Sequence, residues 1–259
     1  MRFDVITLFP DLFAPFLISG VCRRAYESGL VDVKLWNPRD FANGSYRRID
    51  DRPFGGGPGM VMLAEPLALC LAAIHTERGS DSIPVVLFSP VGKTLTHDGV
   101  EHWSDSQGAV LICGRYEGID QRFIDKHVTH QISLGDFVLS GGEIAAMALL
   151  DAVARLQPGV LNDEGSHQLD SFNPALDGLL DCQHYTRPED WQGQTVPDVL
   201  MSGNHSSIEI WRREQRLSLT QQQRPELVDK ARVAGQLTAK DEVFLATLTV
   251  NVTQKNELL

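Results

Sequence analysis

The stretch from Ile132 to Glu143, written ISLGDFVLSGGE, constrains the fold most. An apolar, strand-like lead-in is interrupted by Gly135, Gly141 and Gly142 and opens directly onto the helical pattern EIAAMALLDAVARL. Glycine permits positive φ or a close approach of backbone to a ligand, and the first turn of a helix presents free N–H groups. A plain strand-to-helix connection also uses glycines. The stretch alone therefore leaves open whether it connects or binds.

The rest of the chain alternates strand-like and helical segments. Five apolar runs predict strands over Phe3–Leu8, Val31–Trp36, Pro84–Phe88, Ala109–Cys113 and His130–Leu134. Helical patterns lie between them, over Pro10–Arg24, Leu63–His75, His97–Ser104, Arg122–Lys126 and Gly142–Pro158. This alternation predicts an α/β fold, with a mostly parallel sheet and helices on both faces.

A polar stretch after Pro158 predicts a domain boundary. The expected division is an α/β domain over 1–158, a flexible acidic linker over 159–173 and a small C-terminal domain over 174–259. Three helical patterns fill the last part, over Ser207–Gln222, Glu226–Gly235 and Lys240–Val250. The C-terminal domain is therefore expected to be all-helical.

Composition narrows the class of protein. Hydrophobic residues make up 42% and charged residues 22% of the 259 residues, and no run of about 18 apolar residues exists, which predicts no membrane span. Asp4 and Asp11 interrupt the apolar N-terminus, which favours a first strand over a signal peptide. Widely spaced cysteines without a C-x-x-C pair predict no disulfide framework, no metal site and a cytoplasmic protein; they are Cys22, Cys70, Cys113 and Cys182.

Net charge limits how the chain could contact nucleic acid. A formal charge of −11 argues against a protein that coats RNA or DNA, because that affinity rests on neutralising phosphates. Any RNA contact must be local. The loop from Asn37 to Gly59, with RRIDDRPFGGGPG, and the segment from Ile208 to Arg224, with four arginines against two glutamates, are the candidates. A solvated helix face explains the second segment equally well.

Three loops follow three predicted strands: SPVG after Phe88, GRYEG after Cys113 and GDFVLSGG after Ser133. Ligands of open α/β sheets bind beyond the carboxyl ends of the strands, so the loops should converge on one pocket. Small residues, main chain and a few apolar side chains suit a flat ring such as adenine. No G-x-x-x-x-G-K-[ST] cradle exists, and FPDLF stands where a dinucleotide fold would place G-x-G-x-x-G.

Several motifs in this order resemble the bacterial tRNA (guanine-N1)-methyltransferases that modify guanosine-37. They are DDRPFGGGPGM, CGRYEGID, SLGDFVLSGGE, DSF, GLLDCQHYTRP and MSGNH, and the resemblance runs from Phe3 to about Leu227. It implies a SPOUT-class fold with a C-terminal trefoil knot in the α/β domain. It also implies a homodimer with each active site between subunits, and a role in maintaining the reading frame.

The resemblance further implies S-adenosyl-L-methionine as methyl donor and assigns its contacts. The donor-contact set is Leu87, Ser89, Pro90, Gly114, Tyr116, Glu117, Gly118, Ile132, Leu134, Gly135, Asp136, Phe137, Val138, Leu139, Gly141 and Gly142. Phe137 and Ala145 stand where the family usually has tyrosine and proline, so a hydroxyl contact is lost. Magnesium assistance is implied without assignable ligands.

For catalysis, the resemblance assigns Asp170 as the base that removes the N1 proton and Arg155 as the cation that stabilises O6. From the sequence alone, Asp170 could be a helix cap or a solvated aspartate, and Arg155 could complement a helix dipole. Ser171 and the arginines Arg212, Arg213 and Arg216 are the expected contacts to a tRNA with guanosine at position 37, preferably after guanosine-36.

Two other functions remain open at this level. A non-catalytic RNA-binding module would use the arginine clusters but would not need Asp170 or three convergent glycine loops. A small-molecule methyltransferase would use the donor pocket but would leave the C-terminal helices and the arginines without a task.

Overall fold

A computed structural model describes residues 1–162 and 167–256, with side chains to 248. The chain divides into two compact units, 1–162 and 163–259, so the division falls within the stretch predicted as a linker. Parts of two predicted regions lie outside the described residues: 163–166 of the linker and 257–259 of the C-terminal domain. Among the helices that the structure describes, none is both long and apolar enough to cross a membrane.

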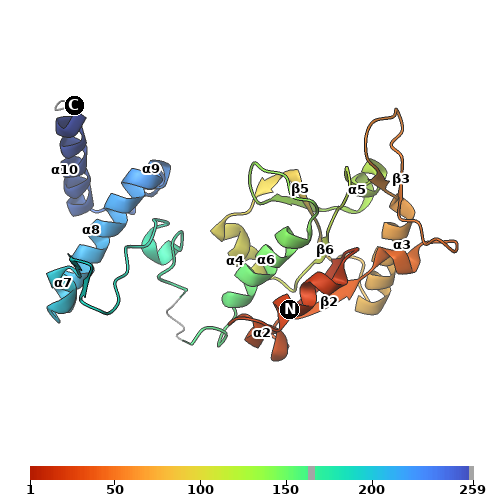
Figure 1. Ribbon diagram of the computed structural model, residues 1–259, viewed down its shortest axis with the longest axis horizontal. Coiled ribbons are helices and arrows are strands. Elements are labelled where there is room, and N and C mark those ends of the chain that lie inside the picture. The colour runs from red at the N-terminus through yellow and green to blue at the C-terminus, as the bar shows by residue number, and fades with distance from the viewer. Residues whose placement is uncertain (163–166, 257–259) are drawn as a thin grey trace. The chain divides into compact units, whose positions relative to one another are not determined.

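The first unit is built on a five-stranded parallel sheet, as predicted (Figure 1). The strands lie in the order β2-β1-β6-β5-β7, and every pair in the sheet is parallel. Their bounds are Arg2–Ile6 for β1, Asp32–Trp36 for β2, Val85–Thr94 for β5, Val110–Ile112 for β6 and His130–Ser133 for β7. The chain thus enters next to the edge strand β2, later places β6 between β1 and β5, and ends the sheet with β7 at the opposite edge.

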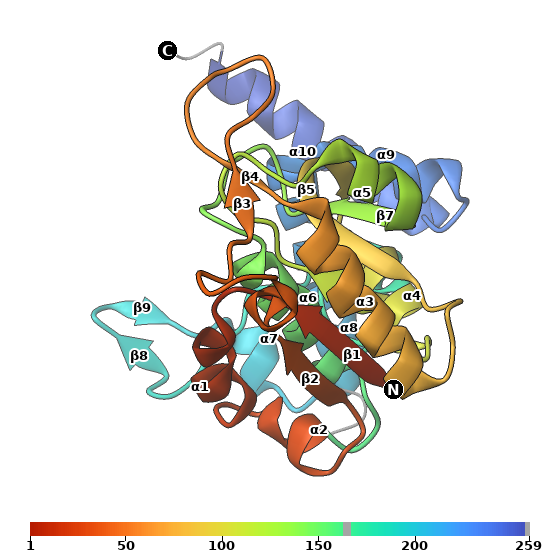
Figure 2. The ribbon, with the colours of Figure 1, turned by 90° about the vertical axis from the view of Figure 1, so that its right-hand side faces the viewer.

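Period-two alternation along the strands separates two cores, one on each face of the sheet. Val86 and Leu111 pack on one face with α4 (His97–Ser104) and α6 (Glu143–Arg155). Their neighbours Val85 and Val110 pack on the other face with α3 (Ala64–Arg78) and α5 (Gln121–His127). Figure 2 looks onto the face covered by α3 and α5. The predicted coverage of both faces is therefore confirmed.

The charged Asp4 is fully buried in the middle of β1, and its carboxylate is fully engaged. Oδ1 accepts hydrogen bonds from Arg2 at 2.6 Å and from the Trp36 indole at 2.9 Å, and Oδ2 accepts one from Arg78 at 3.0 Å. A buried charge is tolerated only when it is paired and hydrogen-bonded. The aspartate that interrupts the apolar N-terminus is thus a core residue that ties β1 to β2 and α3.

The single helix predicted over Pro10–Arg24 is wrong in its continuity. The structure has a 3-10 turn η1 at Pro10–Leu12, then short helices α1 at Phe13–Leu17 and α2 at Arg23–Glu27. Gly20 between the helices adopts φ +69°, which a continuous right-handed helix cannot accommodate. The apolar pattern therefore covers three short helical pieces and not one continuous helix.

The expected turn at SPVG lies inside a strand. β5 continues to Thr94, and both Phe88 and Lys93 pair with Ile132 of β7, so the residues between them bulge out of the ladder. Gly92 at the base of this bulge lies so close to β7 that a Cβ there would be 2.4 Å from the Ile132 nitrogen. The strand thus carries a glycine-dependent bulge where the sequence predicts its end.

The predicted loop from Asn37 to Gly59 contains two regular pieces. A 3-10 turn η2 covers Pro38–Phe41, and the two-residue strand β3 at Asp50–Asp51 pairs antiparallel with β4 at Val61–Met62. The glycine run between β3 and β4 therefore forms the end of a small hairpin that projects from the sheet, as Figure 2 shows.

The second unit is mainly helical. It contains η3 at Pro174–Leu176, α7 at Asp198–Met201, α8 at His205–Gln223, α9 at Pro225–Val233 and α10 at Ala239–Asn256. The expectation of an all-helical unit is wrong in one detail, because Asp190–Trp191 (β8) and Gln194–Thr195 (β9) form an antiparallel hairpin. A small core of its own, around Leu217 and Val228, holds α8 to α9 and α10.

Candidate functional site

A cavity of about 500 Å³ lies at the carboxyl ends of β5, β6 and β7. The three loops predicted to converge do so here, which is the position at which open α/β sheets bind ligands. Every residue of the predicted donor-contact set except Asp136 lines this cavity. Residues that sequence reasoning missed also line it: Phe88, Val91, Arg115, Ile119, Gln121, Ile124, Gln131, Ser133, Ser140 and Ala145.

The glycines at the end of the SGG loop allow the backbone to pass against the GRYEG loop. A Cβ on Gly142 would lie 2.7 Å from the Cys113 Cα, and the Gly142 N–H donates a hydrogen bond to the Gly114 oxygen at 3.0 Å. Gly142 has φ −79°, so its need for glycine comes from this close approach and not from backbone strain. Two walls of the cavity are thereby joined main chain to main chain.

This contact also defines the path of the chain. The loop after the edge strand β7 must pass the end of β5 to reach Cys113 and Gly114 at the end of β6, because β5 lies between β6 and β7. The chain then turns into α6. The connection from β7 to α6 therefore crosses the carboxyl end of the sheet. The cavity lies along this crossing and is called the donor cavity below, because the predicted donor-contact set lines it.

A buried ion pair lies behind these loops. The Glu143 carboxylate, 1% exposed, lies 2.9 Å from Arg115 Nε, although the geometry is that of an ion pair and not of a hydrogen bond. Its other oxygen accepts a hydrogen bond from the Thr7 hydroxyl at 2.9 Å. Arg115 also donates to the Ser140 carbonyl at 3.1 Å and lies 4.4 Å from the Phe9 ring centroid.

Arg115 thus connects the segment directly after β1, the GRYEG loop and the SGGE loop at one point. Sequence reasoning treated GRYEG as a backbone loop and assigned this arginine no role. The available signal was an arginine and a glutamate placed in two motifs that were already expected to meet.

Burial and the nearby Glu143 carboxylate keep the Cys113 thiol in its neutral form. Burial raises the pKa of the Cys113 thiol well above its ordinary value, and the nearby Glu143 charge raises it further, against the opposing effect of Arg115. The thiol is therefore protonated at neutral pH and is not a nucleophile.

The glycine-rich hairpin end packs against the same loop. A Cβ on Gly59 would lie 2.3 Å from Glu117 Oε1, and the Glu117 N–H donates to the Met60 oxygen at 3.0 Å. The hairpin segment predicted to be functional therefore supports the loop that carries Tyr116 and Glu117 into the cavity.

Arg155 does not lie at this cavity. It is the last residue of α6, whereas Gly142 and Ala145 at the opposite end of the helix line the cavity. Ten residues of α-helix separate Ala145 from Arg155, which corresponds to about 15 Å along the axis. Within one chain, the predicted catalytic arginine and the donor cavity are thus at opposite ends of the same helix.

Asp170 and Ser171 belong to the second unit. Asp170 is half-buried in a turn, where its N–H donates to the His167 oxygen at 3.3 Å and its carbonyl accepts from the Asn173 N–H at 3.2 Å. The Ser171 hydroxyl accepts a hydrogen bond from the Asp181 N–H at 2.9 Å. The backbone around the predicted base is therefore ordered by local hydrogen bonds.

The three predicted tRNA-contact arginines differ in their surroundings. Arg213 pairs with Asp241 at 3.1 Å and with Asp177 at 2.7 Å, and Arg216 is buried beside Asp181 at 3.5 Å. Both therefore hold the second unit together. Arg212, with a side chain 43% exposed, pairs with Glu209 on its own helix at 2.9 Å and with no other residue that the structure describes.

Two of these aspartates, Asp241 and Asp181, have pKa values below the ordinary value, which favours their charged forms. Burial alone would raise the pKa of Asp241, but its bonds to Arg213 and to Thr238 lower the pKa below its ordinary value. Burial would also raise the pKa of Asp181. The hydrogen bond from the Cys182 N–H and the interactions with His184 and Arg216 outweigh that effect, so the pKa of Asp181 is lowered as well. The expected RNA-binding surface is thus partly an internal charge network.

No group of three or more His, Cys, Asp and Glu side chains suited to a metal ion occurs within the described parts of the chain. The cavity instead offers main chain from its glycine loops, apolar side chains such as Leu87 and Leu139, and the Glu117 carboxylate at its edge. Its volume lies in the range typical of pockets for small organic ligands. This combination of main-chain groups, apolar side chains and one carboxylate suits an organic cofactor with a flat ring.

Comparisons with known proteins identify the family of this chain. A family model described as tRNA (Guanine-1)-methyltransferase TrmD matches residues 1–230. A tRNA (guanine-N(1)-)-methyltransferase of Polaromonas sp. (strain JS666) is 77% identical, covering 98% of this chain and 99% of that protein. Proteins with the same name from Albidiferax ferrireducens and Bordetella pertussis are 73% and 55% identical, over 95% and 96% of this chain and 99% and 98% of their own lengths. The chain belongs to the tRNA (guanine-1)-methyltransferase TrmD family.

Proposed function

We propose that this protein transfers a methyl group from S-adenosyl-L-methionine to N1 of guanosine-37 in tRNA. The observation that carries the proposal is the cavity formed by the SPVG, GRYEG and GDFVLSGG loops, in a chain of this family. Methylation beside the anticodon by a cytoplasmic enzyme would support maintenance of the reading frame.

The cavity residues suit the adenosyl part of the donor. The bound donor supplies an electrophilic methyl group on a sulfonium. Leu87, Leu134 and Leu139 offer apolar surface for the adenine ring, and the loops around Gly114 and Gly141 offer main-chain donors and acceptors. Phe137 lines the cavity without the hydroxyl that the family's tyrosine would bring, so backbone contacts carry the binding there.

Asp170 is the proposed general base. Guanine N1 carries a proton and is a poor nucleophile until that proton is removed, and a carboxylate within hydrogen-bond reach performs this step. Deprotonation moves negative charge onto O6, which the Arg155 guanidinium stabilises. The target base must leave its stack to reach the cavity, so the mechanism includes base flipping. Magnesium assistance belongs to the proposal without assigned ligands.

The position of Arg155 supports a homodimer with shared active sites. Because this residue lies about 15 Å along α6 from the cavity-lining Ala145, it reaches a donor cavity most directly when that cavity belongs to a second protomer. We also propose that the loop after β7, which crosses the end of β5 to the end of β6, is threaded as the trefoil knot of SPOUT-class enzymes.

The tRNA contact in the second unit is assigned mainly to Arg212. It is the exposed member of the three arginines, while Arg213 and Arg216 position α8 and the segment that carries Ser171. Exchange of Arg212 for glutamine should weaken tRNA binding and reduce its salt dependence by about one phosphate contact.

The decisive experiment uses unmodified tRNA transcripts and labelled S-adenosyl-L-methionine. Label should enter a transcript with guanosine at positions 36 and 37, and primer extension should then stop beside position 37, because N1-methylation blocks base pairing. A matched transcript with adenosine-37 is the control and should stay unlabelled. Absence of transfer to the first transcript would overturn the proposal, and tRNA binding without transfer would identify a non-catalytic RNA-binding module instead.

A further inference from the structure

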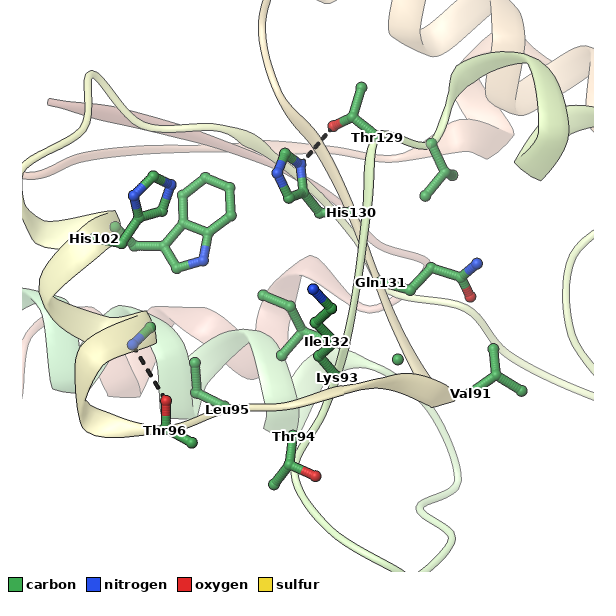
Figure 3. Close-up of a pocket in the computed structure, with 14 residues that line it drawn as sticks. Val91, Lys93, Thr94, Leu95, Thr96, His102, Thr129, His130, Gln131 and Ile132 are labelled. Carbon is green, nitrogen blue, oxygen red and sulfur yellow. Dashed lines mark hydrogen bonds between the residues drawn. The ribbon is translucent and has the colours of Figure 1, made fainter. Parts of the chain in front are cut away.

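A second cavity, of about 560 Å³, lies beside the donor cavity and opens between β5, β7 and α4 (Figure 3). Val91, Gln131 and Ile132 line both cavities, so the bulged part of β5 and the start of β7 form the wall between them. The donor chemistry described above uses the other side of this wall. The second cavity therefore has no task in the proposed methyl transfer.

The lining of this cavity is rich in groups that donate hydrogen bonds or carry positive charge. Lys93 from β5, His102 from α4 and His130 from β7 surround it, as Figure 3 shows. None of its lining residues, all of which lie in the described part of the chain, is an aspartate or glutamate, although the whole chain has 34 of them and a net charge of −11. Lys93 forms no ion pair with a described residue. A basic cavity in an acidic protein favours an anionic ligand.

Trp103 supplies a second, independent observation. Its side chain is only 4% exposed, it lines the cavity, and its ring meets the rings of His102 and His130 edge-on, with centroids 5.4 Å apart in both cases. The indole N–H donates no hydrogen bond to any residue that the structure describes. An indole N–H in the lining of the cavity that has no acceptor among these residues is able to donate to a ligand there.

We propose that this cavity binds a nucleotide phosphate. The Lys93 ammonium, the imidazoles of His102 and His130 and the Trp103 indole N–H are donors in the lining that suit phosphate oxygens. His130 would use Nε2, because its Nδ1 is hydrogen-bonded to the Thr129 hydroxyl at 2.8 Å. The exposed His102 and His130 side chains also offer aromatic surface to a base. The same chemistry fits a phosphate of an RNA backbone and a free mononucleotide. The site does not depend on the proposed methyl transfer.

The test follows the indole N–H itself. The chain has four tryptophans, so a ¹H–¹⁵N spectrum shows four indole signals at most, and Trp103→Phe identifies the signal of Trp103. The protein is first saturated with S-adenosylhomocysteine to block the donor cavity. Uridine 5′-monophosphate is then titrated, with uridine as the matched ligand without a phosphate, and a short single-stranded RNA as the polymer.

The Trp103 signal should move with uridine 5′-monophosphate and not with uridine. Lys93→Gln and His130→Gln should each raise the dissociation constant about tenfold, whereas Lys126→Gln, an exposed lysine outside the cavity lining, should leave it unchanged. Saturation at a lower concentration of RNA than of mononucleotide would identify a backbone phosphate as the ligand, and the reverse order a free nucleotide. A Trp103 signal that stays in place at millimolar ligand, or moves equally with uridine, would overturn the proposal.

Discussion

At the scale of single residues, the Arg115–Glu143 pair holds the donor cavity in shape. Glu143 is buried, and its two oxygens face Arg115 and the Thr7 hydroxyl. Arg115 in turn reaches the Ser140 carbonyl. A carboxylate in such a position must keep its partner, because an uncompensated buried charge costs far more than the pair contributes.

We therefore expect Arg115→Met to destabilise the first unit by about 3–5 kcal/mol, since it leaves the Glu143 carboxylate buried without its cation. The measurement is urea unfolding. Arg115→Met combined with Glu143→Leu is the matched control and should recover most of the loss, because no charge remains buried. If the double variant is as unstable as the single one, the ion pair is not the source of the effect.

Asp170→Asn tests the proposed base. The amide keeps the size and most hydrogen bonds of the carboxylate but cannot take a proton, so turnover should fall about 10²- to 10⁴-fold. Affinity for S-adenosyl-L-methionine, measured by calorimetry, should stay unchanged. Asp98→Asn, an exposed aspartate at the start of α4, serves as the control and should turn over normally. A near-normal rate for Asp170→Asn would remove this residue from the mechanism.

Residue identity did not reveal which arginines are free to bind. Arg212, Arg213 and Arg216 lie close together in one basic helical segment, so the sequence treats them alike. Partners distant in the chain separate them: Asp241 and Asp177 engage Arg213, and Asp181 engages Arg216. Pairing between residues far apart in the sequence is a tertiary property.

At the scale of elements, the glycines of the crossing loop serve different physical needs. Gly135 adopts φ +147°, a conformation that other residues rarely adopt, whereas Gly142 has an ordinary φ and needs space against the Cys113 backbone. The sequence shows a glycine in both places and does not distinguish the unusual φ of Gly135 from the close approach at Gly142. The close approach could not be predicted, because it depends on a neighbouring strand.

Gly142→Ala should therefore displace the SGG loop and weaken donor binding at least tenfold, because the new methyl would meet the Cys113 Cα at 2.7 Å and backbone cannot move aside cheaply. Calorimetry with S-adenosyl-L-methionine provides the measurement. Gly99→Ala, in the first turn of α4, is the matched control: its Cβ would meet only ordinary contacts from 3.5 Å outward. The control should bind normally and gain up to about 1 kcal/mol in stability. Equal donor affinities for the two variants would contradict the steric argument.

At the scale of the whole molecule, Arg155 and the donor cavity raise the question of how many chains make one active site. Arg155 ends α6 about 15 Å along the axis from Ala145, at the opposite end of the helix to the cavity. The proposed C2 dimer, in which each protomer lends groups to its partner's cavity, would resolve this separation.

Mixed dimers test this arrangement. One protomer carries Gly142→Ala, and the donor concentration is kept low enough that its weakened cavity stays mostly empty. The other protomer carries Asp170→Asn and has no base. In a shared site, the intact cavity of the second protomer meets the intact Asp170 of the first, so purified mixed dimers should recover about half of the wild-type rate, with one site of two restored. The two parent homodimers are the controls and should be inactive. Mixed dimers as inactive as their parents would show that each chain forms its site alone.

The sequence by itself determined the α/β class, the parallel sheet and the convergence of three loops, because these follow from local periodicity and from the rule that parallel strands end at one edge. The break between α1 and α2, the bulge in β5 and the roles of Arg115, Arg213 and Trp103 were decided by the tertiary structure. Apart from the break between α1 and α2, which follows from the positive φ of Gly20, each depends on a partner far away in the chain. The bulge depends on β7, against which Gly92 packs, the two arginines depend on the carboxylates that pair with them, and Trp103 depends on the His130 ring that lies against it. Local pattern carries no information on such partners. The glycine-interrupted stretch from Ile132 to Glu143 therefore predicted a loop at a shared pocket, and only the tertiary structure showed that it packs main chain to main chain against Cys113 and Gly114.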